Sequence, residues 1–210
     1  MNVNAEIYFI RHGESYGNVG ANDAETHPDD PKLTEAGLEQ ARRLEARFVP
    51  GEIGAVYASA LIRTCQTMQP TAEKLGLPVR VLRELMEVGT EIDNTQPALA
   101  AKYAPNAYKA LCRVAEQPVL FDPADDTPAV CEKRAAYCVD TILSDCRDGD
   151  KILVCTHGGF IGYLLRYCLG IGLPEHFNWQ IDNSAVFGIR LAKDKIPKLI
   201  CANEISHLKL

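Results

Sequence analysis

The sequence predicts an α/β fold with a mainly parallel sheet, and three observations lead to that prediction. Short apolar runs typical of buried strands alternate with longer amphipathic segments along the 210 residues. Such alternation is typical of parallel strands joined by crossover helices. Two of the runs end on histidine and glycine, at His12-Gly13 and His157-Gly158, where ligands bind in open α/β sheets. The length and the 47% of apolar residues fit a single domain spanning 1–210.

The individual elements follow from hydrophobic periodicity. Six runs predict strands, at residues 6–10, 55–58, 79–82, 151–155, 185–191 and 197–201. Four amphipathic stretches predict helices, at residues 34–48, 60–76, 129–147 and 159–169. Thr34 is the expected N-cap of the first helix. Gly76 is the expected end of the second, with Pro78 beyond it.

Two segments interrupt this alternation. Residues 90–128 hold five prolines and an acidic cluster, and we expect a small cap-like insertion with one or two short helices at about 96–116. Residues 18–32 predict a long loop. Loops on a rigid scaffold often determine specificity, so we expect these two segments to select the substrate.

The charge balance excludes some classes of partner. The net charge of −6 and the isoelectric point near 5.4 argue against binding to nucleic acid or an anionic membrane, which usually needs a basic surface. Arg166 interrupts the best candidate for a membrane-spanning run, at 158–173. The first strand follows Met1 almost directly, so we expect no signal peptide and a cytoplasmic location.

His12 is the candidate nucleophile. A histidine at the end of a strand is more often structural, but here Gly13 allows close backbone approach and Arg11 and Asn18 supply donors nearby. A neutral imidazole can attack phosphorus and form a covalent phospho-enzyme, provided that its other ring nitrogen holds the proton.

The remaining candidates suit a phosphoryl group. The guanidinium groups of Arg11 and Arg63 can bind phosphoryl oxygens in bidentate fashion. His157 can contact the same oxygens in the transition state, and Gly158 opens backbone space at a helix N-terminus. A leaving alkoxide needs a proton, for which Glu84 is the first candidate and Glu87 the second.

Several motifs together resemble the histidine phosphatase superfamily, the phosphoglycerate mutase-like group, in its branch with Gly after the nucleophilic His. In order they are Arg11-His12-Gly13-Glu14-Ser15, Asn18, Leu33-Thr34-x-x-Gly37, Tyr57-Ala58-Ser59-x-Leu61-x-Arg63, Leu82-x-Glu84 and His157-Gly158-Gly159. The resemblance runs from residue 7 to about 207. It implies a three-layer α/β/α sandwich with a mostly parallel sheet and a phosphohistidine intermediate formed without a metal or cofactor.

The resemblance also assigns roles by position. It implies that His12 is the nucleophile, that Arg11, Arg63 and His157 form the phosphate pocket, and that Glu84 donates the proton. Further phosphate or substrate contacts are expected from Asn18, Ser15, Gly158 and Glu87.

The chain departs from the family pattern in three ways. The usual Glu-x-x-x-Gly after the third strand is one residue longer here, from Glu84 to Gly89. The mutase segment with Arg-His-Tyr-Gly is absent, and Gly17 replaces the aromatic that precedes the Asn in mutases. The match is therefore closer to the phosphatase members.

We expect a phosphatase that hydrolyses a small phosphorylated metabolite through His12. Three alternatives remain: a mutase-type phosphotransfer, a non-catalytic binder of a phosphorylated ligand, and a metal hydrolase, whose ligands would lack the usual short helical spacing. The sequence leaves the oligomeric state open, with a homodimer as one alternative.

Overall fold

A computed structural model describes residues 3–90, 96–121, 125–172 and 179–209. Its centre is a six-stranded sheet in the order β3-β2-β4-β1-β5-β6. The strands are β1 (Ala5–Arg11), β2 (Ile53–Ala58), β3 (Val79–Val81), β4 (Asp150–Thr156), β5 (Val186–Leu191) and β6 (Lys198–Glu204). The first four are parallel, whereas β5 pairs antiparallel with both β1 and β6. The carboxyl ends of β1, β2 and β4 therefore meet at one edge of the sheet.

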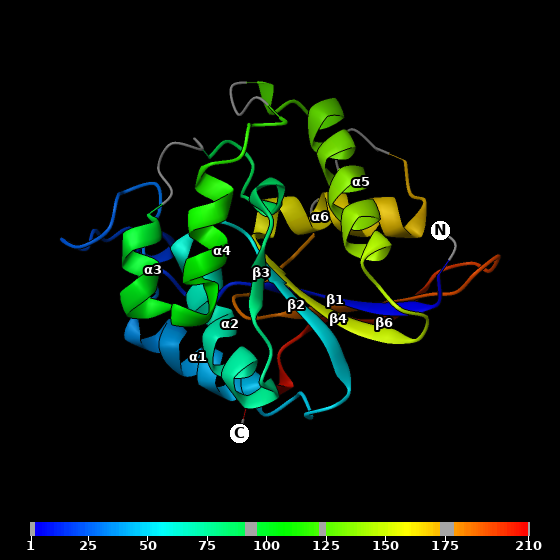
Figure 1. Ribbon diagram of the computed structural model, residues 1–210, viewed down its shortest axis with the longest axis horizontal. Helices are drawn as coiled ribbons and strands as arrows, with labels where there is room; N and C mark the ends of the chain where they lie inside the picture. Colours follow the sequence, from blue (N-terminus) through cyan, green and yellow to red (C-terminus); the bar gives the residue numbers. More distant parts are fainter. Residues whose placement is uncertain (1–2, 91–95, 122–124, 173–178, 210) are drawn as a thin grey trace.

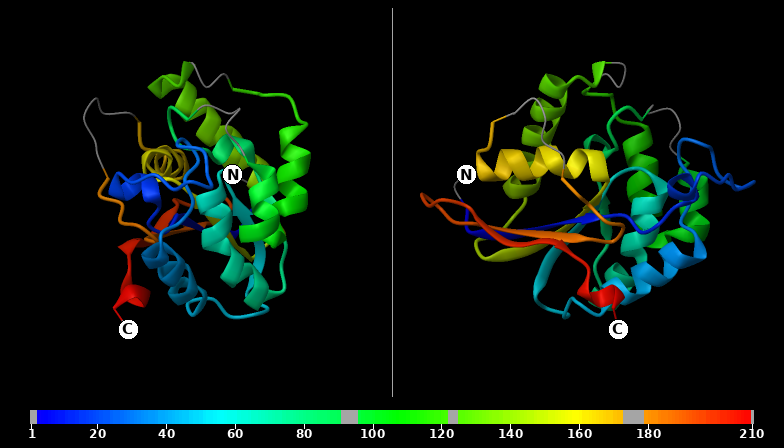
Figure 2. Two further views of the ribbon diagram at one scale, coloured as in Figure 1. Left: turned by 90° about the vertical axis from the view of Figure 1, so that its left-hand side faces the viewer. Right: turned by 180° about the vertical axis from the view of Figure 1, so that it is seen from behind.

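Helices cover both faces of this sheet (Figures 1 and 2). The six α-helices of the described residues are α1 (Glu35–Glu45), α2 (Ile62–Leu75), α3 (Pro97–Tyr103), α4 (Pro105–Ala115), α5 (Pro128–Ser144) and α6 (Gly158–Leu169). One apolar cluster joins α1, α2, α3 and α4 to the first face, and a second joins α5 and α6 to the other. The expected three-layer α/β/α fold is thus confirmed.

Alternation within the strands builds these two clusters. Ile7 and Phe9 of β1 face α5 and α6, whereas Ile10 faces the α1 side. Every one of these side chains is fully buried. Successive side chains of a strand point to opposite faces, so an apolar run without polar alternation is what a sheet covered on both sides requires.

The segment 90–128 is divided between two places. Helices α3 and α4 pack beside α2 and β3 and join the α1 side of the core (Figure 1). Gln69 of α2 is buried where it accepts from the Asn106 N–H of α4, whereas Arg63 and Gln66 are buried against residues 29–33. The later part of the segment, residues 119–121 and Asp126, lies instead beside Glu84 and Glu87.

The strands and helices lie close to their expected ranges. The structure begins β2 two residues earlier than expected and ends α1 at Glu45, although the following Phe48 is still buried. None of the described helices combines the length and the apolar character needed to cross a bilayer.

Candidate active site

The site begins where β1 ends, at a turn that only glycine allows. A Cβ on Gly13 would lie 2.7 Å from the carbonyl oxygen of Gly37, and a Cβ on Gly37 would lie 2.0 Å from that of Glu14. The two glycines let the turn after β1 pack directly on the first turn of α1. Gly13 also donates its N–H to Thr67 Oγ1 of α2 over 3.0 Å. The His12 backbone is therefore held from both α1 and α2.

One hydrogen bond determines which nitrogen of His12 carries the proton. Nδ1 lies 2.7 Å from the carbonyl oxygen of Gly13. A carbonyl can only accept, so Nδ1 carries the hydrogen and Nε2 keeps its lone pair. Burial, and then the charges of Arg63 and Arg11, hold the pKa of His12 well below 6.5. The ring is therefore neutral at pH 7, as a nucleophile must be.

His157 lies directly opposite His12, although 145 positions separate them in the sequence. It follows β4 as the N-cap of α6, and the two ring centroids are 5.1 Å apart. Its Nε2 lies 2.7 Å from Ser59 Oγ, while its Nδ1 is buried and has no hydrogen-bond partner among the described residues. An unpartnered buried ring nitrogen is costly, and a bound anion would satisfy it.

Two arginines complete the cationic surroundings of the rings. The Arg11 guanidinium donates to the Ile181 carbonyl over 2.6 Å, and its buried Nε has no partner among the described residues. Arg63 is buried and lies 3.7 Å from a carboxylate oxygen of Asp30. Burial raises the pKa of Asp30 to about 7, against the opposing charge of Arg63. Both arginines retain N–H groups that can bind an anion.

The amide of Asn18 is tied to the turn by its oxygen. Asn18 Oδ1 accepts from the backbone N–H of Ser15 over 3.0 Å and from Asn183 Nδ2 over 3.0 Å. The Ser15 hydroxyl lies 3.1 Å from the same oxygen, so Ser15 supports Asn18. Since the oxygen is engaged, the amide nitrogen of Asn18 is the end left to contact a ligand.

The two candidate acids have different surroundings. Burial raises the pKa of the Glu84 carboxyl, and its cationic neighbours are Arg83 and Arg134. Glu87, in contrast, contributes negative charge at both Arg11 and Arg63. Its carboxylate accepts from the N–H groups of Gly159 and Phe160 over 3.2 and 3.1 Å. Glu87 therefore lies at the N-terminus of α6, in contact with the residues that follow His157.

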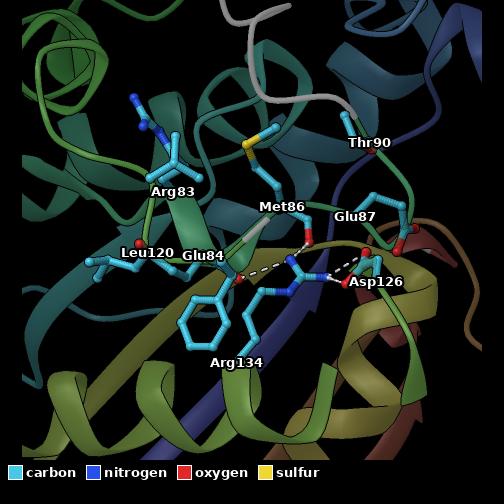
Figure 3. A pocket seen from close by; sticks show the side chains of 10 residues that line it. Arg83, Glu84, Met86, Glu87, Thr90, Leu120, Asp126 and Arg134 are labelled. Atoms are coloured by element: carbon cyan, nitrogen blue, oxygen red, sulfur yellow. Dashed lines mark hydrogen bonds and ion pairs between the residues drawn. The ribbon is translucent and has the colours of Figure 1, made fainter. Parts of the chain in front are cut away.

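Arg134 of α5 holds the segment that carries both acids (Figure 3). Its guanidinium donates to the carbonyl oxygens of Glu84 and Met86 over 3.2 and 2.8 Å, and to both carboxylate oxygens of Asp126 over 3.1 Å. Asp126 in turn accepts from the N–H of Gly89 over 2.6 Å. Figure 3 shows Glu84 and Glu87 on opposite sides of Met86. Arg134 and Asp126 together hold the lengthened segment, residues 84–89, at both ends.

The structure adds site residues that the sequence analysis did not identify. Asn183 contacts both the His12 carbonyl and Asn18, and Thr67 holds Gly13. The polar run before β5 was the only signal for Asn183, because its role depends on the antiparallel pairing of β5 with β1. Thr67 lies inside a helix pattern and gave no signal.

The depressed pKa values of the two histidines predict how stability depends on pH. Below pH 6.5 the unfolded chain binds protons that the folded chain, with neutral His12 and His157, does not bind. The free energy of unfolding should therefore fall as the pH falls from 6.5 toward the folded pKa values, by up to about 2 kcal/mol per histidine at pH 5. Urea unfolding of the wild type and of His157→Gln at pH 7 and pH 5 measures this. The variant should lose less free energy of unfolding between these pH values than the wild type, and an equal loss in both proteins would contradict the prediction.

The fold and the paired histidines define an α/β protein with a cationic pocket at the carboxyl edge of its sheet. The sequence of the chain matches the family model of the histidine phosphatase superfamily (branch 1) over residues 7–204. Phosphoglycerate mutase-like protein 4 of Arabidopsis thaliana is 31% identical over 164 residues, which cover 75% of this chain and 68% of that protein. The chain therefore belongs to branch 1 of the histidine phosphatase superfamily.

Solved structures share the fold over nearly the whole chain. The phosphoserine phosphatase of Entamoeba histolytica, in complex with 3-phosphoglyceric acid, has a TM-score of 0.68 at 21% identity, covering 97% of this chain and 99% of that one. The phosphoglycerate mutase of Bacillus anthracis str. Sterne has a TM-score of 0.65 at 20% identity, covering 99% of this chain and 96% of that one. The names of these relatives refer to phosphorylated small molecules.

Proposed function

We propose that this protein is a phosphatase that hydrolyses a small phosphate monoester through a phosphohistidine on His12. The observation that carries the proposal is the His12 ring itself. Its Nδ1 is bound to the Gly13 carbonyl at 2.7 Å, and its neighbours are His157 and two arginines. A neutral imidazole with one lone pair, fixed among cations, suits attack on an anionic phosphorus centre.

In the first step Nε2 of His12 attacks phosphorus, and the bond from phosphorus to the ester oxygen breaks in line with the attack. Arg11 and Arg63 bind the phosphoryl oxygens, and His157 donates to them from Nδ1. In this tautomer Nε2 of His157 accepts from the Ser59 hydroxyl, which lies 2.7 Å away. Donors already in place stabilise the charge of the transition state without reorganisation.

In this proposal Glu87 enters the first step in its protonated form and donates that proton to the leaving alkoxide, in place of Glu84. Glu87 is the carboxylate beside Arg11 and Arg63 and beside the residues that follow His157. Glu84 faces the α5 side, where its charge acts on Cys138. In the second step Glu87 takes a proton from water, the water oxygen attacks phosphorus, and the bond from phosphorus to Nε2 breaks to release phosphate.

The insertion is proposed as a cap in two parts. Its first part is tied to the loop 18–32, since Gln96 accepts from the His27 N–H and donates to the Asp30 carbonyl. Lys102 also pairs with Glu25 of the loop at 3.0 Å. The loop and the first part of the insertion are therefore linked, beside the Arg63 end of the pocket.

Hydrolysis of p-nitrophenyl phosphate at mildly acidic pH in excess EDTA tests the proposal. We expect turnover that EDTA does not reduce, with phosphate as the product. The described part of the chain contains no group of three or more His, Cys, Asp or Glu side chains arranged to hold a metal ion. Loss of turnover in EDTA would contradict the metal-independent mechanism.

A product assay separates hydrolysis from phosphotransfer. With 3-phosphoglycerate as substrate, a mutase would return the phosphoryl group to a second hydroxyl, whereas the proposed phosphatase would release inorganic phosphate. Isomerised phosphoglycerate in excess over phosphate would overturn the proposal.

A further inference from the structure

A cleft runs along α6 from the phosphate pocket. It has a volume of about 460 Å³, within the range of roughly 300–1,000 Å³ that is common for sites of organic ligands. Its lining combines polar and apolar surface in about equal parts, and we call it the α6 cleft. The uncharged residues of the lining include Gly158, Gly159, Gly162, Tyr163, Trp179 and Ile181.

Glycines let the side chains that line the cleft approach α6 closely. Gly158, Gly159 and Gly162 leave one side of the first turns of α6 without side chains. A Cβ on Gly162 would lie 3.0 Å from Cδ1 of Trp179, so the glycine lets the indole lie against the helix. Trp179 is held from behind by Phe187 of β5, with the two rings edge to face and their centroids 6.4 Å apart. The indole therefore packs between α6 and β5.

The cleft is continuous with the proposed reaction centre. Arg11 and Glu87 line it together with Gly158, and a Cβ on Gly158 would lie 3.3 Å from Arg11 Nε. Its lining also includes Arg166, eight residues along the helix from Gly158, a distance of roughly 12 Å at the usual helical rise. The Arg166 guanidinium lies 6.0 Å from the centre of the Tyr163 ring.

We propose that the α6 cleft holds the alcohol part of the substrate, and that preferred substrates are phosphate monoesters of alcohols bearing a flat aromatic or heteroaromatic ring. The inference rests on the proposed function, because the phosphoryl group must occupy the pocket around His12. A three-carbon acid such as phosphoserine would leave most of the cleft filled with water. A ring between Tyr163 and Trp179 would bury apolar surface on aromatic walls, and its ester oxygen would lie near Glu87.

Two alkyl phosphates test the inference while keeping the leaving oxygen chemically alike. Ethyl phosphate and naphthylethyl phosphate both release a primary alkoxide, and only the second carries a ring. We expect kcat/KM for naphthylethyl phosphate to exceed that for ethyl phosphate by at least about tenfold in the wild type. The substitutions Gly162→Leu, which pushes the indole away from α6, and Trp179→Ala, which removes the indole, should each reduce this ratio to within about threefold.

Tyr167→Ala is the matched control. Tyr167 lies on the same helix one turn after Tyr163, but its hydroxyl binds Asp140 of α5 at 2.8 Å, and it does not line the cleft. For Tyr167→Ala, the ratio of kcat/KM for naphthylethyl phosphate to that for ethyl phosphate should equal the wild-type ratio. A wild-type ratio near one, with both esters hydrolysed, would overturn the inference alone. Failure to hydrolyse these esters and p-nitrophenyl phosphate as well would overturn the proposed function, and the inference with it.

Discussion

His12→Ala should lower kcat/KM for any phosphate monoester by at least about four orders of magnitude, because it removes the atom that forms the covalent bond to phosphorus. The remaining pocket would still bind the phosphoryl group through Arg11, Arg63 and His157. Stopped-time assays of phosphate release measure the loss. Acid-labile, base-stable labelling of the wild-type chain by a radiolabelled ester, absent from the variant, would locate the phosphoryl group on a histidine.

His27→Ala is a suitable control for this experiment. His27 lies on the surface, where it faces Asp29 at 3.6 Å, and we expect this variant to retain wild-type turnover and labelling. Thermal unfolding of both variants checks that each is folded. Labelling of His12→Ala at the wild-type level would show that another residue is the nucleophile.

Glu87→Gln should lower kcat for ethyl phosphate by roughly 10²–10⁴, the usual contribution of a general acid. The effect on p-nitrophenyl phosphate should be much smaller, because p-nitrophenolate leaves without needing a proton. The amide oxygen of Gln can still accept from the N–H groups of Gly159 and Phe160, which Glu87 binds in the wild type. The substitution therefore removes the acid while keeping the hydrogen bonds to the N-terminus of α6.

Glu84→Gln is the matched control, since it changes the neighbouring candidate in the same way. We expect a loss of less than about tenfold for both esters, because Glu84 lies toward Arg134 and Cys138. The opposite pattern, with the large and ester-dependent loss in Glu84→Gln, would return the role of acid to Glu84. Comparing the two esters separates a chemical role from a general loss of structure, which would affect both alike.

Local patterns were sufficient to predict most of the fold and the centre of the site. Ile7, Phe9 and Ile10 belong to an apolar run that is buried on both faces, as in a central parallel strand. Because the ends of parallel strands meet at one edge, the histidines after β1 and β4 were expected together, and their ring centroids are 5.1 Å apart. Local patterns predicted a cap-like insertion, and its described residues divide between the α2 side and the segment of Glu84 and Glu87.

The choice between Glu84 and Glu87 shows where local patterns stop. Both lie in one short segment, and nothing in that segment indicates which carboxylate turns toward the arginines. Contacts from Arg134 and Asp126, 50 and 42 positions from Glu84 in the sequence, hold the backbone so that Glu87 reaches the N-terminus of α6. The extra residue between Glu84 and Gly89 changes the direction in which each carboxylate points. Contacts with residues distant in the sequence then decide which of the two carboxylates faces the arginines.

The chain alone determined the α/β class, the two histidines at strand ends and the arginines near them, because hydrophobic period and strand polarity are properties of consecutive residues. The tertiary structure decided the strand order, the support of His12 by Asn183 and Thr67, the position of Glu87, and the cleft between α6 and Trp179. Each of these depends on which distant segments pack together, and that packing is set by the burial of shared apolar surface across the whole sheet.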